Sequence, residues 1–205
     1  MLQVHGLDFA YPRQPTLFSN WSLDLPSGVT WVGGDESTGK TTLLRLLAGE
    51  LQPQSGSLRL GDGTTLAGDR AAYQRQLAWA DPRSGAFDAF TPPAYWNRLR
   101  TRYPGWDAEL LTDLMAGLAL EPHLPKTLCK LSTGTKRKVF LAGALASGTA
   151  VTLLDEPFAA LDRASIAMVL EFLQEASGHR TRSWVVADYE APRGVGLAAT
   201  YKIGQ

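Results

Sequence analysis

The sequence contains little of what extracellular domains and zinc-binding domains need. It has 205 residues with one cysteine, Cys129, and three histidines that stand far apart in the chain. A single cysteine cannot form an internal disulfide or a multi-cysteine metal site, and the histidines lack metal-ligand spacing. We therefore expect the chain to fold in a reducing compartment without a structural zinc site.

Long apolar runs and an excess of either charge are also absent. No segment approaches the roughly 20 consecutive apolar residues of a membrane-spanning helix, and residues 1–15 do not have the pattern of a signal peptide. Lys+Arg and Asp+Glu both number 20, so the net charge favours neither nucleic acid nor an anionic membrane as a ligand. We expect a cytoplasmic protein that binds no nucleic acid, does not insert into the membrane, and serves a membrane only through a partner.

The length suits one domain spanning residues 1–205 with a modest insertion. Strands and helices alternate in the second half, which predicts a parallel sheet with crossover helices. Residues 91–130 have a helical spacing of leucines and predict a helical insertion, which we place at about 84–133. Strands are predicted at Leu2–Phe9, Trp21–Leu25, Val29–Val32, Ser57–Leu60, Leu77–Ala80, Ala150–Leu154 and Ser183–Ala187, and helices at Thr41–Ala48, Lys136–Ser147 and Ile166–Ala176.

A phosphate-binding loop is predicted between the third strand and the first helix. Gly34-Asp35-Glu36-Ser37-Thr38-Gly39-Lys40-Thr41 matches G-x-x-x-x-G-K-[ST] in full, in the strand–helix context that this motif requires. Backbone N–H groups of such a loop surround a phosphate, and the helix N-terminus adds partial positive charge. We expect the loop and the adjacent Thr42 to bind ATP, with Lys40 on the β- and γ-phosphates and Thr41 on Mg²⁺. The alternative is a glycine turn that precedes a helix by chance.

Two carboxylates inside this loop are unusual for a site that holds a triphosphate. Asp35 and Glu36 would weaken phosphate binding by like-charge repulsion if they faced it. We therefore expect both side chains to point away from the phosphates.

An apolar strand ends in a second acidic pair, Asp155 and Glu156. Such a strand end can supply a Mg²⁺ site and an adjacent general base. We expect Asp155 to hold the metal, through water, and Glu156 to polarise the attacking water. An acidic pair at a strand end is a common surface feature when it stands alone, and its position beside a phosphate loop makes it specific.

Three further motifs place the sequence in a family. Leu131-Ser132-Thr133-Gly134 resembles the LSGGQ signature of ABC ATPases, opens a helix, and lies about twenty residues before the acidic strand. Ala159-Ala160-Leu161-Asp162 resembles the D-loop of that family, and Tyr11 resembles the A-loop aromatic residue that stacks on adenine. With the phosphate loop and the acidic strand, these motifs occur in the family's order over nearly the whole chain.

The resemblance to ABC transporter ATPases implies a fold and a mechanism. The fold is an α/β P-loop NTPase with a mostly parallel sheet core, an N-terminal antiparallel β subdomain and a small helical subdomain. Two nucleotide-binding domains, identical or different, pair head to tail, so that Ser132, Gly134 and Asp162 act on ATP held by the opposite subunit. The dimer drives a transmembrane permease subunit, which holds it on the inner face of the cell membrane.

Two segments are ambiguous. Residues 103–107, with the sequence Tyr-Pro-Gly-Trp-Asp, are similar to a stretch of ABC-2-type export ATPases, and ordinary aromatic packing explains them equally well. The basic cluster Lys136-Arg137-Lys138 is expected to be a solvated helix face, because three charges are few for a nucleic-acid patch.

The sequence departs from the family at two sensing positions. Where the family has a glutamine after the fifth strand, the chain reads Asp81-Pro82-Arg83-Ser84. Where the family has a histidine after the last predicted strand, ungapped spacing places Tyr189, with Asp188 as the other candidate. A tyrosine hydroxyl can donate a hydrogen bond to the γ-phosphate but carries no positive charge. We therefore expect Lys40, Glu156 and Tyr189 to support hydrolysis that is slow.

Several functions remain open. The leading hypothesis is a transport ATPase, and the main alternative is a degenerate subunit that binds ATP with little hydrolysis. A soluble ABC ATPase that acts on ribosomes or DNA would generally carry two cassettes or a long inserted arm, which this sequence does not show. A small-molecule kinase would not explain Leu131–Gly134 or Leu161-Asp162.

Overall fold

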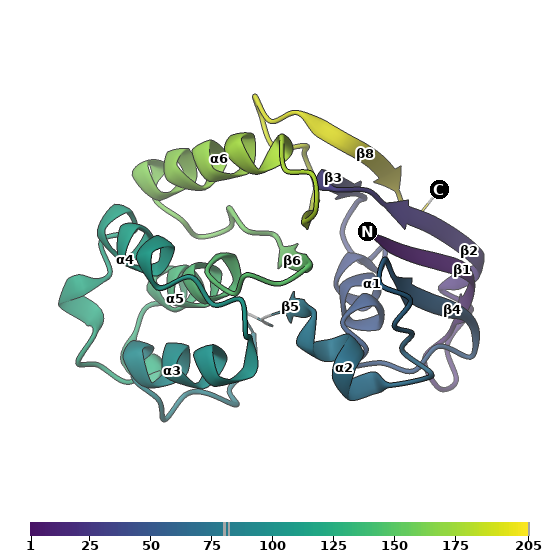
Figure 1. The fold of residues 1–205 in the computed structure, drawn as a ribbon, viewed down its shortest axis with the longest axis horizontal. Helices are drawn as coiled ribbons and strands as arrows, with labels where there is room; N and C mark the ends of the chain where they lie inside the picture. The colour runs from purple at the N-terminus through teal and green to yellow at the C-terminus, as the bar shows by residue number, and fades with distance from the viewer. Residues whose placement is uncertain (80, 82, 205) are drawn as a thin grey trace.

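The structure, a computed structural model, describes residues 1–79, 81 and 83–204 (Figure 1). The chain alternates between short strands and helices. In chain order the elements are β1 (Leu2–Phe9), β2 (Phe18–Leu25), β3 (Gly28–Gly33), α1 (Lys40–Leu47), β4 (Ser55–Leu60), α2 (Arg70–Arg75), β5 (Leu77–Trp79), α3 (Pro92–Arg102), α4 (Ala108–Gly117), α5 (Thr133–Leu145), β6 (Val151–Asp155), α6 (Arg163–Ser177), β7 (Ser183–Asp188) and β8 (Leu197–Lys202), with 3₁₀ turns at Glu121–His123 and Leu128–Lys130.

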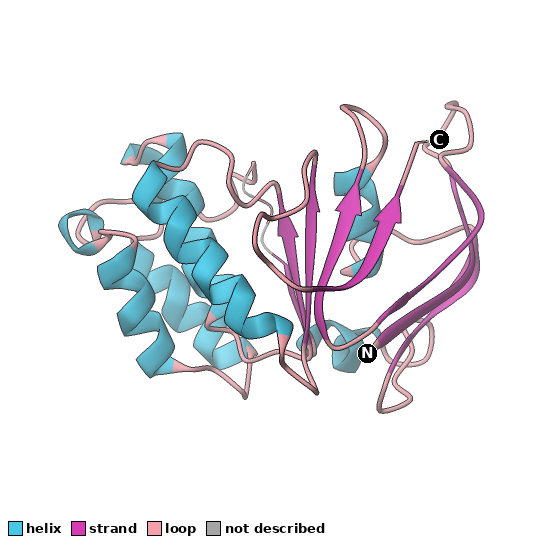
Figure 2. Ribbon diagram, turned by 90° about the horizontal axis from the view of Figure 1, so that it is seen from above, coloured by secondary structure: helices cyan, strands magenta, loops and turns pink. Residues whose placement is uncertain are grey.

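The strands form two sheets. β2, β1 and β4 make an antiparallel sheet in that order, and β5, β6, β7, β3 and β8 make a parallel sheet. Figure 2 shows helices on one side of the parallel sheet and the antiparallel sheet on the other, with α1 between the two sheets. This arrangement confirms the predicted α/β fold with a mostly parallel core and an N-terminal antiparallel β unit.

Two apolar cores lie on opposite faces of the parallel sheet. One core contains the leucines of α1 together with the inward side chains of the antiparallel sheet. The other contains α5 and the buried residues of α3, α4 and α6. Successive residues of β7 enter different cores, Val185 the first and Val186 the second. The strand is buried on both faces, which explains why its sequence is continuously apolar instead of alternating.

The structure contains every strand and helix that the sequence predicts, with bounds shifted by a few residues. The predicted strand Leu77–Ala80 is observed as Leu77–Trp79, and Ala80 lies outside the described residues. The elements α2 and β8 are not predicted by the sequence. Only Tyr73 is buried in α2, and β8 is a strand at the edge of its sheet with no fully buried residue, so neither has a strong apolar pattern.

The segment expected as a helical insertion, residues 84–133, carries α3 and α4, which pack against α5 and α6. Its status as a subdomain stays a prediction. The Tyr-Pro-Gly-Trp-Asp stretch serves packing here, since the Tyr103 hydroxyl donates to the Leu77 carbonyl (3.1 Å) and Asp107 caps α4. Within the described part of the chain, no helix is both long and apolar enough to cross a membrane.

The parallel register brings three strand ends to one edge of the sheet. Gly33 of β3 pairs with Asp188 of β7, and Asp155 of β6 pairs with Ala187 of the same strand. The residues that follow β3, β6 and β7 are therefore neighbours in space, although they are far apart in sequence. Ligands of parallel α/β sheets bind outside these carboxyl ends.

Candidate functional site

The loop between β3 and α1 is held in a conformation that leaves the start of the helix open. Gly39 precedes α1 with φ +100°, in the left-handed region that favours glycine. No side chain of the described residues caps the first turn of α1. The free N–H groups and the helix dipole of this turn are therefore available to an anion.

The ammonium group of Lys40 is held by the loop itself. Lys40 is 5% exposed, and its Nζ donates to the carbonyls of Gly34 (2.6 Å) and Asp35 (2.8 Å). The ring of Tyr189 covers the ammonium group, with the centroid 4.0 Å from Nζ. The loop carbonyls therefore use two of the three N–H donors of Lys40, and the third is left for a ligand such as a phosphate.

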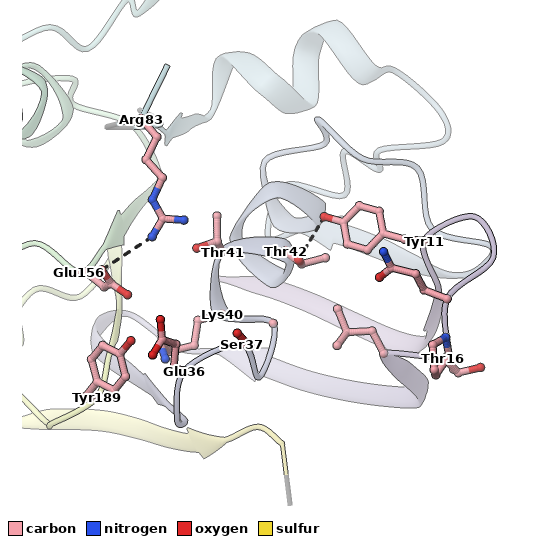
Figure 3. A pocket seen from close by; sticks show the side chains of 14 residues that line it. Tyr11, Thr16, Glu36, Ser37, Lys40, Thr41, Thr42, Arg83, Glu156 and Tyr189 are labelled. Carbon is pink, nitrogen blue, oxygen red and sulfur yellow. Dashed lines mark hydrogen bonds and ion pairs between the residues drawn. The ribbon is translucent and has the colours of Figure 1, made fainter. Parts of the chain in front are cut away.

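A cavity of about 510 Å³ opens beside this loop (Figure 3). Its size is that of a site for a small organic ligand. Phosphate-loop residues and Glu156 lie toward one end, and Tyr11 lies at the other. The lining residues are Tyr11, Gln14, Pro15, Thr16, Leu17, Glu36, Ser37, Gly39, Lys40, Thr41, Thr42, Arg83, Glu156 and Tyr189.

Thr41 and Asp155 form the floor of the phosphate end. The Thr41 hydroxyl donates to Asp155 Oδ2 (2.7 Å), while Oδ1 of the same carboxylate is buried with no partner among the described residues. Burial raises the pKa of Asp155, against the effect of the Thr41 hydrogen bond. A hydroxyl and a carboxylate oxygen with free lone pairs fit Mg²⁺, which takes few protein ligands and keeps phosphate and water oxygens.

Glu156 sits on the strand end in a strained conformation. Its φ is +46°, which is uncommon for a non-glycine residue. Its N–H donates to the Ala187 carbonyl (2.8 Å), and its own carbonyl accepts from Arg137 Nη1 (2.6 Å). These bonds fix the backbone, so that the carboxylate faces the cavity.

Tyr189 follows β7 and lies in the cavity wall. It is 49% exposed, and its backbone N–H donates to the Asp188 carboxylate (2.7 Å). Burial raises the pKa of Asp188, whose backbone carbonyl accepts from Trp31 Nε1 (3.2 Å). Of the two candidates for the sensing position, Tyr189 lines the cavity and Asp188 supports the turn beneath it.

The two loop carboxylates differ in their surroundings. Asp35 is exposed and does not line the cavity, whereas Glu36 lines it beside Lys40 and Tyr189, and the expected direction of both side chains away from bound phosphates stays a prediction. Thr38 donates to the Asp35 carbonyl (2.9 Å) and closes the turn. Because like charges repel, an outward direction of the exposed Glu36 side chain would favour the entry of a triphosphate.

The aromatic end of the cavity is held by a cross-link between two elements. The Tyr11 hydroxyl and the Thr42 hydroxyl on α1 are hydrogen bonded (3.1 Å). The Tyr11 ring packs edge to face on Phe9, with centroids 5.0 Å apart. Tyr11 is therefore a wall of the cavity, as its predicted role on adenine requires.

The signature and D-loop residues lie outside this cavity. Ser132 caps α5 by accepting from the Thr135 N–H (3.1 Å), and Asp162 caps α6 by accepting from the Ser165 N–H (2.9 Å). Gly134 packs so closely on the D-loop that a Cβ there would lie 2.4 Å from the Ala160 carbonyl oxygen. None of Ser132, Gly134 and Asp162 lines the cavity in this chain.

The basic cluster on α5 is not the solvated face that the sequence suggested. Lys136 pairs with Asp88 (2.5 Å) and Lys138 pairs with Asp162, and both lysine side chains are less than one fifth exposed. Arg137 donates to the Glu156 carbonyl. The three residues tether α5 to three segments, which shields their charge from solvent.

Sequence reasoning missed Arg83 as a cavity residue. Its Nη2 lies 3.8 Å from Glu156 Oε2, and its side chain is 62% exposed. The available signal was its place in the segment that substitutes for the family's glutamine. The segment follows β5, so the position of Arg83 depends on how the strands pair in the sheet. The sequence alone does not predict that pairing.

The phosphate loop on α1 beside an acidic end of a parallel strand defines a P-loop NTPase fold. A sequence model of the ABC transporter family matches residues 18–159. The cytochrome c biogenesis ATP-binding export protein CcmA of Legionella pneumophila is 35% identical over 187 residues, which cover 91% of this chain and 90% of that protein. The phosphonates import ATP-binding protein PhnC of Chromohalobacter salexigens is 28% identical, over 94% of this chain and 76% of that protein.

Solved structures agree on the fold. An ATP-binding subunit of an ABC transporter superposes with a TM-score of 0.80 at 23% identity, covering 91% of this chain and 78% of that one. A dimeric bacterial ABC transporter cassette gives a TM-score of 0.72 at 18% identity, covering 93% and 88%. The chain belongs to the ABC transporter family of ATP-binding proteins. It is an ATP-binding subunit of an ATP-driven transporter, and its relatives include both an export and an import protein.

Proposed function

We propose that the chain hydrolyses ATP and passes the resulting change of shape to a separate transmembrane subunit, on which it sits at the inner face of the membrane. The observation that carries the proposal is the meeting of Lys40, Thr41 and Glu156 in one cavity, above Asp155. Positioning and electrostatic stabilisation are what phosphoryl transfer demands of a protein.

Each of these residues has a defined task in the proposal. Lys40 and the free N–H groups of α1 bind the β- and γ-phosphates. Thr41 and Asp155 would hold Mg²⁺, which would neutralise charge on the phosphates. Glu156 orients a water molecule and accepts its proton as the water oxygen bonds to the γ-phosphorus. The bond from that phosphorus to the β–γ bridging oxygen breaks, and ADP leaves with this oxygen.

The adenine end is assigned to Tyr11. Its ring lies at the end of the cavity away from Glu156, and an aromatic face suits a purine base. The loop residues Gly34, Asp35, Glu36, Ser37, Thr38 and Gly39, together with Thr42, complete the proposed ATP contacts, through backbone N–H groups where the side chains are acidic.

A head-to-tail dimer, of identical or different chains, completes the site. In one chain Ser132, Gly134 and Asp162 lie away from the cavity, so they have no access to the ATP bound there. The N-terminus of α5 behind Ser132 is suited to a phosphate of the opposite subunit. A cassette with the same fold that is dimeric supports the pairing of two such domains.

A second candidate is a subunit that binds ATP but hydrolyses it slowly. It is favoured by Tyr189, which occupies the cavity wall where a histidine would supply a charge. The residues Asp81 and Arg83 stand where a glutamine would link the site to the membrane partner.

Among transport directions we propose export, on the likeness to the CcmA protein.

Release of phosphate from Mg·ATP by the purified chain, compared with Glu156→Gln and Lys40→Ala, tests the proposal. We expect both substitutions to abolish hydrolysis. ATP binding should be kept in Glu156→Gln and lost in Lys40→Ala. Glu156→Gln with ATP should also form a dimer that light scattering detects. Wild-type phosphate release no faster than that of Glu156→Gln favours the second candidate, and unchanged ATP affinity in Lys40→Ala means that the phosphate loop is misassigned.

A further inference from the structure

We propose that Arg83 is a second phosphate-binding cation of this site, paired with Glu156 in the free chain and with the γ-phosphate when ATP is bound. The proposal rests on the function proposed above and deepens it. In this proposal, Arg83 supplies part of the positive charge that a histidine would carry at position 189, where this chain has a tyrosine.

The position of Arg83 allows both partners. Figure 3 shows its side chain pointing toward Glu156 at one end of the cavity, which Thr41 also lines. The closest approach, 3.8 Å from Nη2 to Glu156 Oε2, is an ion pair but too long for a hydrogen bond. The guanidinium donates no hydrogen bond to another residue that the structure describes, and the side chain is exposed enough to swing.

The other positive groups near the phosphates already have partners in the protein. Lys40 is held by two carbonyls and covered by the Tyr189 ring. Arg137 is turned to the Glu156 carbonyl and does not line the cavity. Among the described residues that line it, Arg83 is therefore the cation whose side-chain donors make no hydrogen bond to another described residue, whereas Lys40 uses two of its three donors.

The charge of the site also calls for such a group. Glu36 and Glu156 line the cavity, Asp155 lies beneath it, and ATP brings several further negative charges. An arginine fork matches phosphate geometry in a way that an ammonium group does not. When the fork moves to the phosphate, the Glu156 carboxylate loses its ion pair and is free to accept a proton from water.

Arg83 contacts the γ-phosphate in this proposal, and not the α- and β-phosphates. Glu156, which acts at the γ-phosphate, is its neighbour, while Tyr11 marks the adenine end at the far side of the cavity. Loss of Arg83 should therefore weaken ATP binding and leave ADP binding almost unchanged. A residue with a purely structural role would affect the two nucleotides equally.

The experiment measures Mg·ATP and Mg·ADP affinities by calorimetry in the Glu156→Gln chain, where hydrolysis is blocked and the ion pair is already removed. Adding Arg83→Ala should lower ATP affinity about tenfold, the loss of one charge-assisted contact, and ADP affinity less than about twofold. Adding Arg83→Lys instead should give an ATP affinity between that of the Glu156→Gln chain and that of the same chain with Arg83→Ala. The matched control is Arg45→Ala, which removes an arginine paired with Glu50 (3.4 Å) outside the cavity and should change neither affinity.

The possible outcomes distinguish the role of Arg83 from the proposed function on which it rests. If ATP binds and Lys40→Ala abolishes binding, but Arg83→Ala leaves the preference for ATP over ADP intact, only the role of Arg83 is overturned. An equal loss for ATP and ADP overturns it too. If the Glu156→Gln chain binds no ATP at all, the proposed function fails together with the role of Arg83.

Discussion

The hydroxyl of Thr41 donates a hydrogen bond of 2.7 Å to the carboxylate of Asp155, although 114 positions separate the two residues in the chain. The bond joins the start of α1 to the end of β6 and fixes one carboxylate oxygen. The other oxygen is buried without a partner among the residues that the structure describes. A buried polar atom of this kind is costly unless a ligand satisfies it, and its neighbours suit a divalent cation.

Thr41→Val and Asp155→Asn should both weaken Mg·ATP binding, because the first removes a hydroxyl ligand of the proposed cation and the second removes the negative charge that helps to hold it. The expected loss is at least about tenfold in the presence of Mg²⁺, and it should vanish in EDTA. Calorimetric titration of ATP with and without Mg²⁺ measures the difference. An equal loss in EDTA would mean that the two side chains shape the pocket and do not hold the metal.

Tyr189→His should raise the rate of phosphate release several-fold, because it places a group that can carry positive charge in the cavity wall beside Lys40. Tyr189→Phe keeps the ring over Lys40 and removes only the hydroxyl, so it serves as the matched control and should be no faster than wild type. Steady-state release at saturating Mg·ATP measures both. A histidine variant slower than wild type would contradict the slow-hydrolysis proposal.

Gly134→Ala should destabilise the protein, because the new Cβ would lie 2.4 Å from the Ala160 carbonyl oxygen, which is backbone and cannot rotate away. Overpacking of this kind costs about 1–3 kcal/mol of unfolding free energy. Gly178→Ala is the control, since its nearest atom would be 3.8 Å away, and surface changes usually stay within about 0.5 kcal/mol. Urea unfolding compares the two, and equal midpoints would show that the signature and the D-loop are not in tight contact.

The carboxylate of Asp162 should stabilise the fold over most of the pH range. The ion pair with Lys138, followed by the Ser165 N–H, holds the pKa of Asp162 well below the ordinary value of 3.8. Since the folded state lowers the pKa, this stability is complete above the unfolded value and is lost as the pH falls through the lower folded value. The melting temperature of Asp162→Ala should therefore lie below that of wild type by a constant difference from pH 8 to pH 5. This difference should shrink below about pH 4.

Thermal melts of both proteins across this range provide the measurement. Asp162→Asn is the control that retains a capping oxygen and removes the charge. It should recover part of the difference, and that part should not depend on pH. A difference for Asp162→Ala that grows toward pH 3 would contradict the assigned ion pair.

Much of the architecture could be predicted because its signals are local or periodic. The buried strand β6 is a continuous apolar run, and α6 has the amphipathic spacing of a helix packed on one face. The helix α2 could not be predicted, because a six-residue helix that buries only Tyr73 has no such pattern. The edge strand β8 escaped for the same reason, since its order comes from pairing with β3.

The sequence by itself determined the parts of the site whose residues are adjacent in the chain. The phosphate loop from Gly34 to Thr41 and the pair Asp155-Glu156 are recognisable because turn, helix start and strand end are written in neighbouring residues. Tertiary structure alone decided which side chains meet around them. Arg83 faces Glu156, the basic cluster Lys136–Lys138 is tied to three segments, and Glu36 lines the cavity. These directions follow from how distant segments pack, and no local pattern in the chain encodes that packing.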